Sequence, residues 1–523
     1  MGAEQNSTKK VLKSSAKMAV ATFSSRILGL VREQVMAATF GASGITDAFT
    51  IAYRVPNMLR DLFAEGAFSS AFVPIFTEAK LKNEDEARRL LWSLFVLLGS
   101  ITLFLSIGIF FFADPIVHFF TNEKFTSDPE RLNLTINLVK IMSPFLVFIS
   151  LAALFMGALN SLKIFFVPSL APAFFNIVMI ASIVSLPALL KDSGIHPVYC
   201  LGIGVLVGGF VQMAIQLPIL FKQAYGPKGP LTFVNSYTKR IIHRVGIGTI
   251  GIAATQINVL INTILATGTV IGAVSWLTYA FRLFQFPVGI LSVSIAGSNL
   301  VHFSDAWKSG EKERAVNLLS TSYFLSFLVI APAFALLFAM GEATVHLVFE
   351  RGAFDATDSA MTGIALKYYL FGLPFYGLYK IFAPTFFTLD RPKIPVFISV
   401  GSIIFNIVFC VSLVPIYGFK ILALGTSVSM FLNSTAQSIF LRKYLELPGS
   451  FFFNRRVGKT IIGGALCYLT ASYLVSVLPL TTGAFYSKIS YFCLTGLAGA
   501  ATYFLVMAIF GELNPILRLI KRR

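Results

Sequence analysis

The sequence has few charged residues. Asp, Glu, Lys and Arg make up 13% of its 523 residues, whereas hydrophobic residues make up 56%. A soluble domain carries roughly 25% charged residues, so this composition excludes a large globular enzyme and predicts a polytopic membrane protein. The apolar runs are continuous and do not alternate over about ten residues, which argues against a transmembrane β-barrel.

Cysteine and histidine are also scarce. Cys200, Cys410, Cys467 and Cys493 are scattered without CxxC spacing, and we expect them to pack in the core. The five histidines show no HxxxH or carboxylate spacing, so we expect neither a metal nor a cofactor. The N-terminus lacks a short cleavable hydrophobic stretch, and we expect the first span to act as the insertion signal.

Long apolar runs are abundant. A membrane-spanning helix needs about 20 apolar residues, and about fourteen candidate spans can be counted in the sequence. The expected fold is therefore an all-α bundle of about 14 transmembrane helices, the first two long and interrupted. The spans lie near residues 12–40, 45–80, 89–113, 132–159, 165–189, 197–222, 239–268, 271–303, 316–340, 360–388, 393–414, 419–442, 457–478 and 487–511.

The net charge of +18 is concentrated in alternate loops. The positive-inside rule places such Lys- and Arg-rich loops in the cytoplasm. Both termini are then cytoplasmic, which an even number of spans satisfies, and the positive charge needs no nucleic-acid partner. The basic segments lie before residue 18 and at 80–89, 222–244, 308–314, 391–393, 442–459 and 518–523.

The sequence also contains an internal repeat at an offset of about 228–230 residues. Residues 160–164 correspond to 390–394, and the Phe-Asn-Ile-Val motif at 175–178 recurs at 405–408. Because six spans precede the second copy, we expect two six-helix lobes related by a pseudo-two-fold axis along the membrane normal, which usually rock around a central site. The predicted parts are an N-terminal lobe (1–222), a cytoplasmic linker (223–238), a C-terminal lobe (239–445) and two additional helices with a basic tail (446–523).

Five arginines lie in or beside apolar spans, where a charge costs several kcal/mol and usually lines a polar cavity or pathway. Arg26 and Arg32 are separated by about 120° around a helix and about 9 Å along it, and we expect both to face one cavity. Guanidinium groups match phosphate oxygens two at a time. We therefore expect Arg26, Arg32 and Arg282 to bind a diphosphate in a central cavity. Supporting or gating roles, or ion pairs that hold helices together, are expected for Glu33, Asp47, Arg54, Arg60, Asp61 and Glu65.

The surroundings of these residues carry a resemblance to a known family. Residues 25–32 read SRILGLVR, 46–49 read TDAF, 56–60 read PNMLR and 63–74 read FAEGAFSSAFVP. This pattern resembles the N-terminal signature of the MurJ (MviN) family of lipid II flippases, members of the multidrug/oligosaccharidyl-lipid/polysaccharide exporter superfamily. The resemblance is dense over residues 24–74 and weaker over the rest of the chain.

The resemblance implies a transporter of the bacterial inner membrane that supports peptidoglycan synthesis, cell wall biogenesis and cell shape. Lipid II, an undecaprenyl-diphosphate precursor, would pass from the cytoplasmic to the periplasmic leaflet by alternating access. Membrane lipids and cell-wall synthesis proteins are further candidate partners, and coupling to the membrane potential or to a monovalent cation stays open. The implied important residues are Arg26, Arg32, Asp47, Arg60 and Arg282, and the last two helices would form a groove for the lipid tail.

Other functions fit less well. Export of another polyprenyl-diphosphate-linked oligosaccharide needs the same chemistry and stays open, whereas a drug exporter would be expected to carry membrane acids. A membrane-embedded glycosyltransferase needs paired carboxylates or a metal site on a sizeable outside loop, and the outside loops here are short. Phe281 stands where many family members carry an acid, which leaves the charge partner of Arg282 open.

Overall fold

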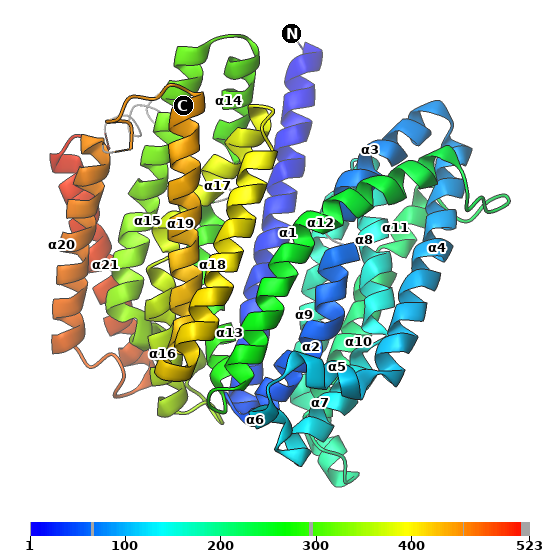
Figure 1. Cartoon of the computed structure of the whole chain (residues 1–523), viewed down its shortest axis with the longest axis horizontal. Helices are drawn as coiled ribbons and strands as arrows, with labels where there is room; N and C mark the ends of the chain where they lie inside the picture. Colours follow the sequence, from blue (N-terminus) through cyan, green and yellow to red (C-terminus); the bar gives the residue numbers. More distant parts are fainter. Residues whose placement is uncertain (1, 64–66, 292–296, 453, 514–523) are drawn as a thin grey trace. The chain divides into compact units, whose positions relative to one another are not determined.

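The computed structural model describes residues 2–63, 67–291, 297–452 and 454–513. All regular structure in these ranges is α-helical, and the chain divides into two compact units, residues 1–274 and 275–523. The first unit contains α1 (Gly2–Phe40), α2 (Gly44–Phe63), α3 (Ala67–Lys82), α4 (Glu84–Phe111), α5 (Ala113–Phe120), α6 (Glu123–Thr126), α7 (Pro129–Met142), α8 (Phe145–Ser161), α9 (Phe166–Asp192), α10 (Tyr199–Ala214), α11 (Leu217–Lys222) and α12 (Ser236–Thr267) (Figure 1).

Almost all of α13 (Ala273–Leu291) and all later helices belong to the second unit. These are α14 (Gly297–Lys308), α15 (Lys312–Phe349), α16 (Ala356–Leu370), α17 (Leu373–Thr388), α18 (Lys393–Tyr417), α19 (Lys420–Tyr444), α20 (Arg455–Val477) and α21 (Phe485–Ile509).

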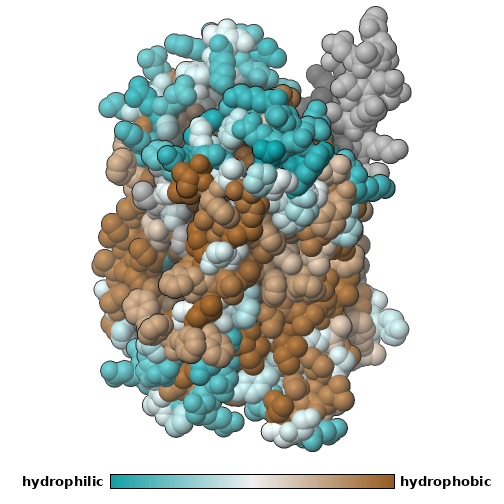
Figure 2. Space-filling view, turned by 90° about the vertical axis from the view of Figure 1, so that its right-hand side faces the viewer, coloured by the Kyte–Doolittle hydropathy of each residue, from teal (hydrophilic) through white to brown (hydrophobic). Residues whose placement is uncertain are grey.

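Each of the fourteen predicted spans falls on one helix or on two consecutive helices. Within the described ranges, seven helices are long and apolar enough to cross a membrane, or eight when α7 and α8, bent by 40° at their junction, count as one span. On the face of the molecule shown in Figure 2, hydrophobic residues form a belt between hydrophilic ends. The chain is an all-α polytopic membrane protein, as the apolar runs predicted.

The internal repeat is visible in where the helices break. The α7–α8 junction in the first half and the α16–α17 junction in the second both place a proline, Pro144 or Pro374, at the start of the following helix. Proline lacks a backbone N–H, so it is tolerated in the first turn of a helix but interrupts a longer one. Corresponding spans of the two halves are therefore broken for the same physical reason.

Backbone conformation shows the same repeat. Among the described residues, four non-glycine residues have positive φ, namely Lys163 (61°), Ala224 (61°), Asp390 (54°) and Glu446 (53°). Each lies just after the end of a helix. The backbone N–H of the next residue donates to the carbonyl five residues before it, at 2.9–3.0 Å, which is the helix ending known as a Schellman motif. Lys163 and Asp390 follow α8 and α17, and Ala224 and Glu446 follow α11 and α19. Lys163 and Asp390 are 227 residues apart, three fewer than the offset at which residues 160–164 pair with 390–394 in sequence.

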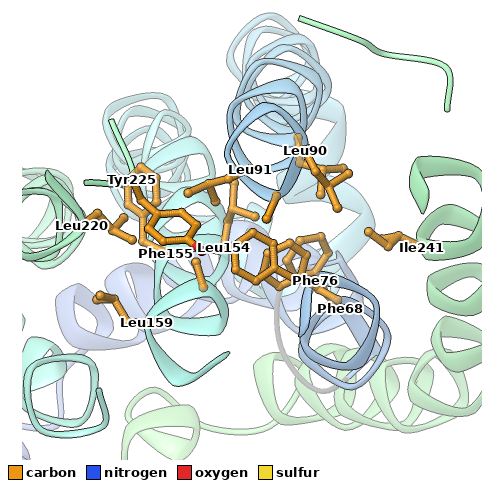
Figure 3. Close-up of a cluster of buried hydrophobic side chains, with 14 of the residues drawn as sticks. Phe68, Phe76, Leu90, Leu91, Leu154, Phe155, Leu159, Leu220, Tyr225 and Ile241 are labelled. Atoms are coloured by element: carbon orange, nitrogen blue, oxygen red, sulfur yellow. The ribbon is translucent and has the colours of Figure 1, made fainter. Parts of the chain in front are cut away.

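The first unit is packed around aromatic side chains of α3. Phe68, Phe72 and Phe76 stack in sequence with ring centroids 5.4 and 5.0 Å apart, and they meet leucines of α4 and α8 (Figure 3). Phe72 is fully buried, and α8 presents Gly157 to its ring. A Cβ at Gly157 would lie 2.8 Å from Phe72 Cδ1. The close approach of α3 and α8 therefore depends on the missing side chain.

Helix α12 begins the second half of the sequence, yet it packs within the first compact unit. Tyr237 and Ile241 near its start belong to the same core cluster as Phe72. Beside them, Arg240 donates from both terminal nitrogens to the two carboxylate oxygens of Glu78 on α3, at 3.1 and 2.9 Å. Side chains from the first half of the sequence and from the start of the second half thus pack in one hydrophobic core.

In the second unit, α20 and α21 pack against α15. The buried Tyr503 hydroxyl of α21 donates to the Leu328 carbonyl at 2.9 Å. At one end of the pair, buried Glu512 accepts from Lys459 at 2.7 Å. At the other, Lys488 Nζ lies 3.0 Å from His346 Nε2. Tyr503 and Lys488 thus connect α21 to α15, and Lys459 and Glu512 connect the start of α20 to the residues just after α21.

The cysteine expectation was correct for three residues and wrong for one. Cys200, Cys410 and Cys467 are buried, whereas Cys493 is exposed on α21. Hydropathy alone does not distinguish an apolar helix face that meets another helix from one that meets lipid.

Candidate functional site

Arg32 is held by three neighbouring groups on α1 and α9. Its Nη2 lies 2.5 Å from Glu33 Oε1, and its Nη1 donates to Asn176 Oδ1 at 3.1 Å. The guanidinium carbon lies 5.8 Å from the centre of the Phe175 ring, a cation–π distance. The Arg32 side chain is 14% exposed and Glu33 is buried. The protein thus fixes the orientation of this guanidinium.

Arg26, on the same helix, is exposed and has no hydrogen bond or ion pair with any other described residue. The seven-residue segment from Arg26 to Arg32 includes Gly29, which lowers helix stability. An oriented cation and an exposed cation therefore occupy one helix. This pair can bind an anion with two acceptor groups.

Asp47, Arg54 and Asp61 lie at seven-residue intervals on α2, which places them along one stripe of the helix. Arg54 Nη1 donates to Thr263 Oγ1 of α12, and Gln256 Nε2 of α12 donates to Asp61 Oδ2 at 3.2 Å. Thr263 and Gln256 are also seven residues apart. These polar contacts between α2 and α12 form the α2–α12 seam.

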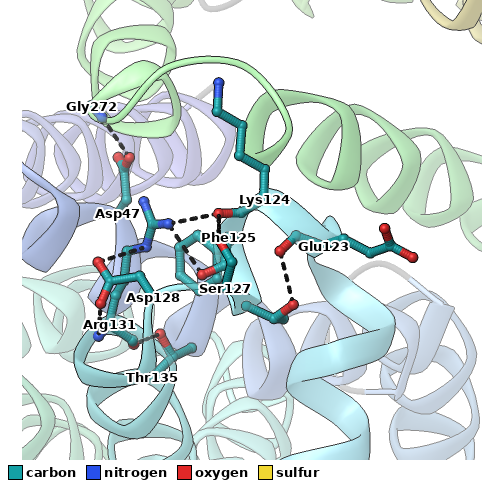
Figure 4. Close-up of polar contacts among 10 residues, drawn as sticks. Asp47, Glu123, Lys124, Phe125, Ser127, Asp128, Arg131, Thr135 and Gly272 are labelled. Atoms are coloured by element: carbon teal, nitrogen blue, oxygen red, sulfur yellow. Dashed lines mark hydrogen bonds and ion pairs between the residues drawn. The ribbon is translucent and has the colours of Figure 1, made fainter.

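At one end of the α2–α12 seam, Asp47 contacts the turn that connects α12 to α13. Its Oδ2 accepts from the backbone N–H of Gly272 at 2.7 Å, and the Asp47 side chain is buried (Figure 4). Gly272 has φ of +90°, a conformation that residues with a Cβ rarely adopt. Asp47 therefore fixes the turn between α12 and α13.

The turn at α6 supports the same region. Arg131 of α7 is buried and donates Nη2 to the carbonyls of Lys124 and Phe125, both at 3.1 Å (Figure 4). The Asn122 N–H donates to Thr267 Oγ1 at 2.9 Å, at the end of α12. The end of α12 is thus held by side chains from α2 and by the turn around α6.

Two more predicted residues lie at or near the end of α2. Arg60 Nη2 pairs with Asp61 Oδ1 at 2.8 Å, and the two side chains are 20% and 28% exposed. The ion-pair alternative considered for the arginines therefore applies to Arg32 with Glu33 and to Arg60 with Asp61. Glu65 lies outside the residues that the structure describes.

Arg282 lies on α13 in the second unit and is exposed. The preceding residue, Phe281, packs against Phe284 and Tyr369 with ring centroids 5.6 and 5.3 Å apart. Phe281 is thus part of an aromatic cluster. Phe281 therefore supplies packing and no charge beside Arg282.

Sequence reasoning missed Asn176 as a contact of Arg32. The residue was noted only as part of the repeated Phe-Asn-Ile-Val motif, although an amide inside an apolar span is itself a signal, because it needs a hydrogen-bond partner there. Among the described residues, no group of three or more His, Cys, Asp or Glu is placed so that it could hold a metal ion.

Comparison with solved structures first defines the class. A transporter titled "Inward-facing conformation of a multidrug resistance MATE family transporter of the MOP superfamily" matches with a TM-score of 0.67 at 12% identity, covering 81% of this chain and 94% of that one. At this identity the likeness concerns the fold alone. The chain is a polytopic membrane protein with the fold of MOP-superfamily transporters.

Closer comparisons give the family. Residues 36–495 match the family model "Lipid II flippase MurJ". A "Lipid II flippase MurJ" from Burkholderia cenocepacia is 35% identical over 460 residues, covering 86% of this chain and 88% of the relative. A relative from Rhizobium meliloti is 33% identical over 98% of this chain and 96% of its own length. The structure "Lipid II flippase MurJ, inward closed conformation" matches with a TM-score of 0.78 at 26% identity, covering 96% of this chain and 99% of that one. The chain belongs to the MurJ family.

Proposed function

We propose that this protein is a lipid II flippase that moves its substrate from the cytoplasmic to the periplasmic leaflet of the bacterial inner membrane by alternating access. The observation that carries the proposal is the pair of arginines on α1. Arg32 is oriented by Glu33 and Asn176, and Arg26 is exposed on the same helix. Two guanidinium groups in apolar surroundings suit a diphosphate on a polyprenyl chain.

Arg282 is the third cation of the proposed site. Its neighbour Phe281 is occupied in aromatic packing, so the adjacent position contributes no acid to compete with an anionic headgroup. The tail of the substrate would stay in lipid, and α20 and α21 are the helices expected to offer it a groove. Arginine keeps its charge at neutral pH, so this site would hold an anion throughout the cycle.

Topology and driving force follow from the same proposal. With the basic loops in the cytoplasm, both termini are cytoplasmic. An inside-negative potential then favours outward movement of an anionic headgroup by about 2.3 kcal/mol per charge per 100 mV if the charge crosses the full field. Such coupling needs no cofactor, and a monovalent cation is the alternative source of coupling.

Depletion of the protein tests the function directly. With a leaflet-specific assay for lipid II, depletion should leave lipid II accessible only from the cytoplasmic side. Normal arrival at the periplasmic face would refute the proposal. Accumulation of a different polyprenyl-diphosphate oligosaccharide, with lipid II unaffected, would favour the alternative exporter.

Complementation then tests the site. Arg26→Ala and Arg282→Ala should each fail to restore lipid II export, whereas Arg89→Ala, which removes an exposed arginine at the start of α4, should restore it. Protein levels are compared by immunoblot so that loss of folding is recognised. Full export by both site variants would remove the cavity argument.

A further inference from the structure

Asn176 connects α9 to two points on α1. Its Oδ1 accepts from Arg32 Nη1 at 3.1 Å, and its Nδ2 donates to the Ser25 carbonyl at 3.2 Å. The amide orientation follows from its partners, because a guanidinium only donates and a carbonyl only accepts. Ser25 and Arg32 are seven residues apart, about two helical turns, so both lie on the face of α1 that meets α9.

The two contacts of Asn176 lie on either side of Gly29 in α1. Gly29 lies between the two partners of Asn176, and a Cβ there would lie 3.6 Å from Asn176 Nδ2. Since glycine lowers helix stability, a side chain that joins the turns before and after it keeps the backbone from bending. The same contact fixes the spacing between Arg32 and Arg26, which directly follows Ser25.

The second copy of the repeated motif contains a buried asparagine as well. Asn406 occupies the matching place in the second Phe-Asn-Ile-Val motif and is equally buried, and it accepts from Cys410 Sγ of its own helix at 3.5 Å. The motif therefore buries an amide in both halves, and in the first half the amide contacts an arginine of the candidate site.

We propose that Asn176 is a positioning residue for the anion site: it orients the Arg32 guanidinium and braces α1 so that Arg26 and Arg32 keep a fixed separation. This inference rests on the proposed function, because Asn176 acts on the diphosphate only through the orientation of Arg32 and its spacing from Arg26. Its buried amide is satisfied at both ends, so the brace costs no unpaired polar group in the apolar interior.

A double-mutant cycle on purified full-length protein tests the proposal. Asn176→Ala should weaken binding of lipid II about 10-fold, the effect of losing one hydrogen bond to a charged group. Asn176→Ala combined with Arg32→Ala should bind no more weakly than Arg32→Ala alone. Additive weakening would overturn the proposal, since Asn176 would then act independently of Arg32.

The matched control is Ser182→Ala. Ser182 is also a buried polar residue of α9, but its hydroxyl donates to the Cys200 carbonyl of α10 at 2.6 Å. It should reduce thermal stability without changing lipid II affinity. Equal loss of affinity in Ser182→Ala and Asn176→Ala would assign Asn176 a merely structural role.

A substrate-free readout separates this inference from the proposed function. In protein labelled on arginine, the side-chain NMR signal of Arg32, assigned with Arg32→Lys, should show restricted guanidinium rotation in the wild type and averaged rotation in Asn176→Ala. If the wild type fails to bind lipid II but this difference is present, the proposed substrate is wrong and the positioning role stands. An Arg32 signal identical in both proteins would refute the positioning role.

Discussion

The hydrogen bond from Gly272 to Asp47 gives a sharp prediction about the turn between α12 and α13. Asp47→Ala removes a buried carboxylate that accepts a backbone N–H at 2.7 Å. The N–H remains buried in a turn whose φ of +90° restricts how it can move toward another acceptor. The variant should therefore open this turn more often than the wild type does.

The magnitude follows from the chemistry of the bond. A hydrogen bond to a charged group stabilises by about 1.5–3 kcal/mol, and each 1.4 kcal/mol corresponds to a factor of about ten. Asp47→Ala should then accelerate hydrogen exchange at the Gly272 amide by about 10- to 150-fold. Asp47→Asn keeps a neutral acceptor oxygen, so about 1 kcal/mol is lost and exchange should rise about fivefold.

Hydrogen–deuterium exchange with mass spectrometry measures the exchange rate of the Gly272 amide on peptides that cover residues 268–274. Asp114→Ala serves as the control, because Asp114 is a 63% exposed acid of α5 whose neighbour His118, 3.5 Å away, lies on its own helix. Its exchange profile around Gly272 should match the wild type. Unchanged exchange in Asp47→Ala, together with lost lipid II export, would refute the role of Asp47 in fixing the turn and would place Asp47 in contact with substrate.

Four further substitutions test the packing. Gly157→Ala should lower stability by about 1–3 kcal/mol in thermal unfolding, because the Phe72 ring lies 2.8 Å from the new Cβ; an unchanged melting temperature would contradict this. Tyr225→Phe should raise stability by up to about 1 kcal/mol, since the buried hydroxyl has no hydrogen-bond partner among the described residues. Burial also raises the pKa of Tyr225 above its ordinary 10.0, so the wild type, unlike this variant, should lose stability as pH rises above about 10. Glu512→Ala leaves two neighbouring cations unpaired and should destabilise α20 and α21 by about 1–3 kcal/mol, detected by thermal unfolding or limited proteolysis. Lys488→Met should speed hydrogen exchange at the start of α21 while leaving α4 unaffected.

The length and position of the spans could be predicted because the bilayer imposes them. A run of about 20 apolar residues has few stable alternatives to a spanning helix, and every predicted span falls on helix. The breaks at Pro144 and Pro374 were also open to prediction, since proline cannot continue a helix without losing a hydrogen bond. These features depend on local sequence only.

Contacts between distant segments could not be predicted in the same way. Arg32 and Asn176 are 144 residues apart, and nothing local to either specifies the other. The packing of α12 in the first compact unit depends on contacts such as Arg240 with Glu78, 162 residues apart. A sequence repeat defines which helices are related by duplication, whereas side-chain contacts decide which helices pack together.

The polar contacts sort the intramembrane arginines by role more sharply than sequence could. Arg54 donates to α12 and Arg60 pairs with Asp61, so both stabilise the end of α2 and its seam with α12. Arg26 and Arg282 are exposed within apolar segments. Arg32 shares features of both groups: it bonds to Asn176 and Glu33 of the protein, and it lies on the same helix as the exposed Arg26.

This division explains why arginine suits the site better than lysine. A guanidinium has five donors in a rigid fork, so one side chain can bind protein acceptors and phosphate oxygens at the same time. A lysine ammonium has three donors on a flexible stem, and pairing with Glu33 and Asn176 would leave it little capacity for a ligand. Arg32→Lys should therefore keep the ion pair with Glu33 and the fold, yet lose lipid II export nearly as completely as Arg32→Ala. Export close to wild-type levels in Arg32→Lys would mean that charge alone suffices, and the forked geometry on which the anion site is argued would be unnecessary.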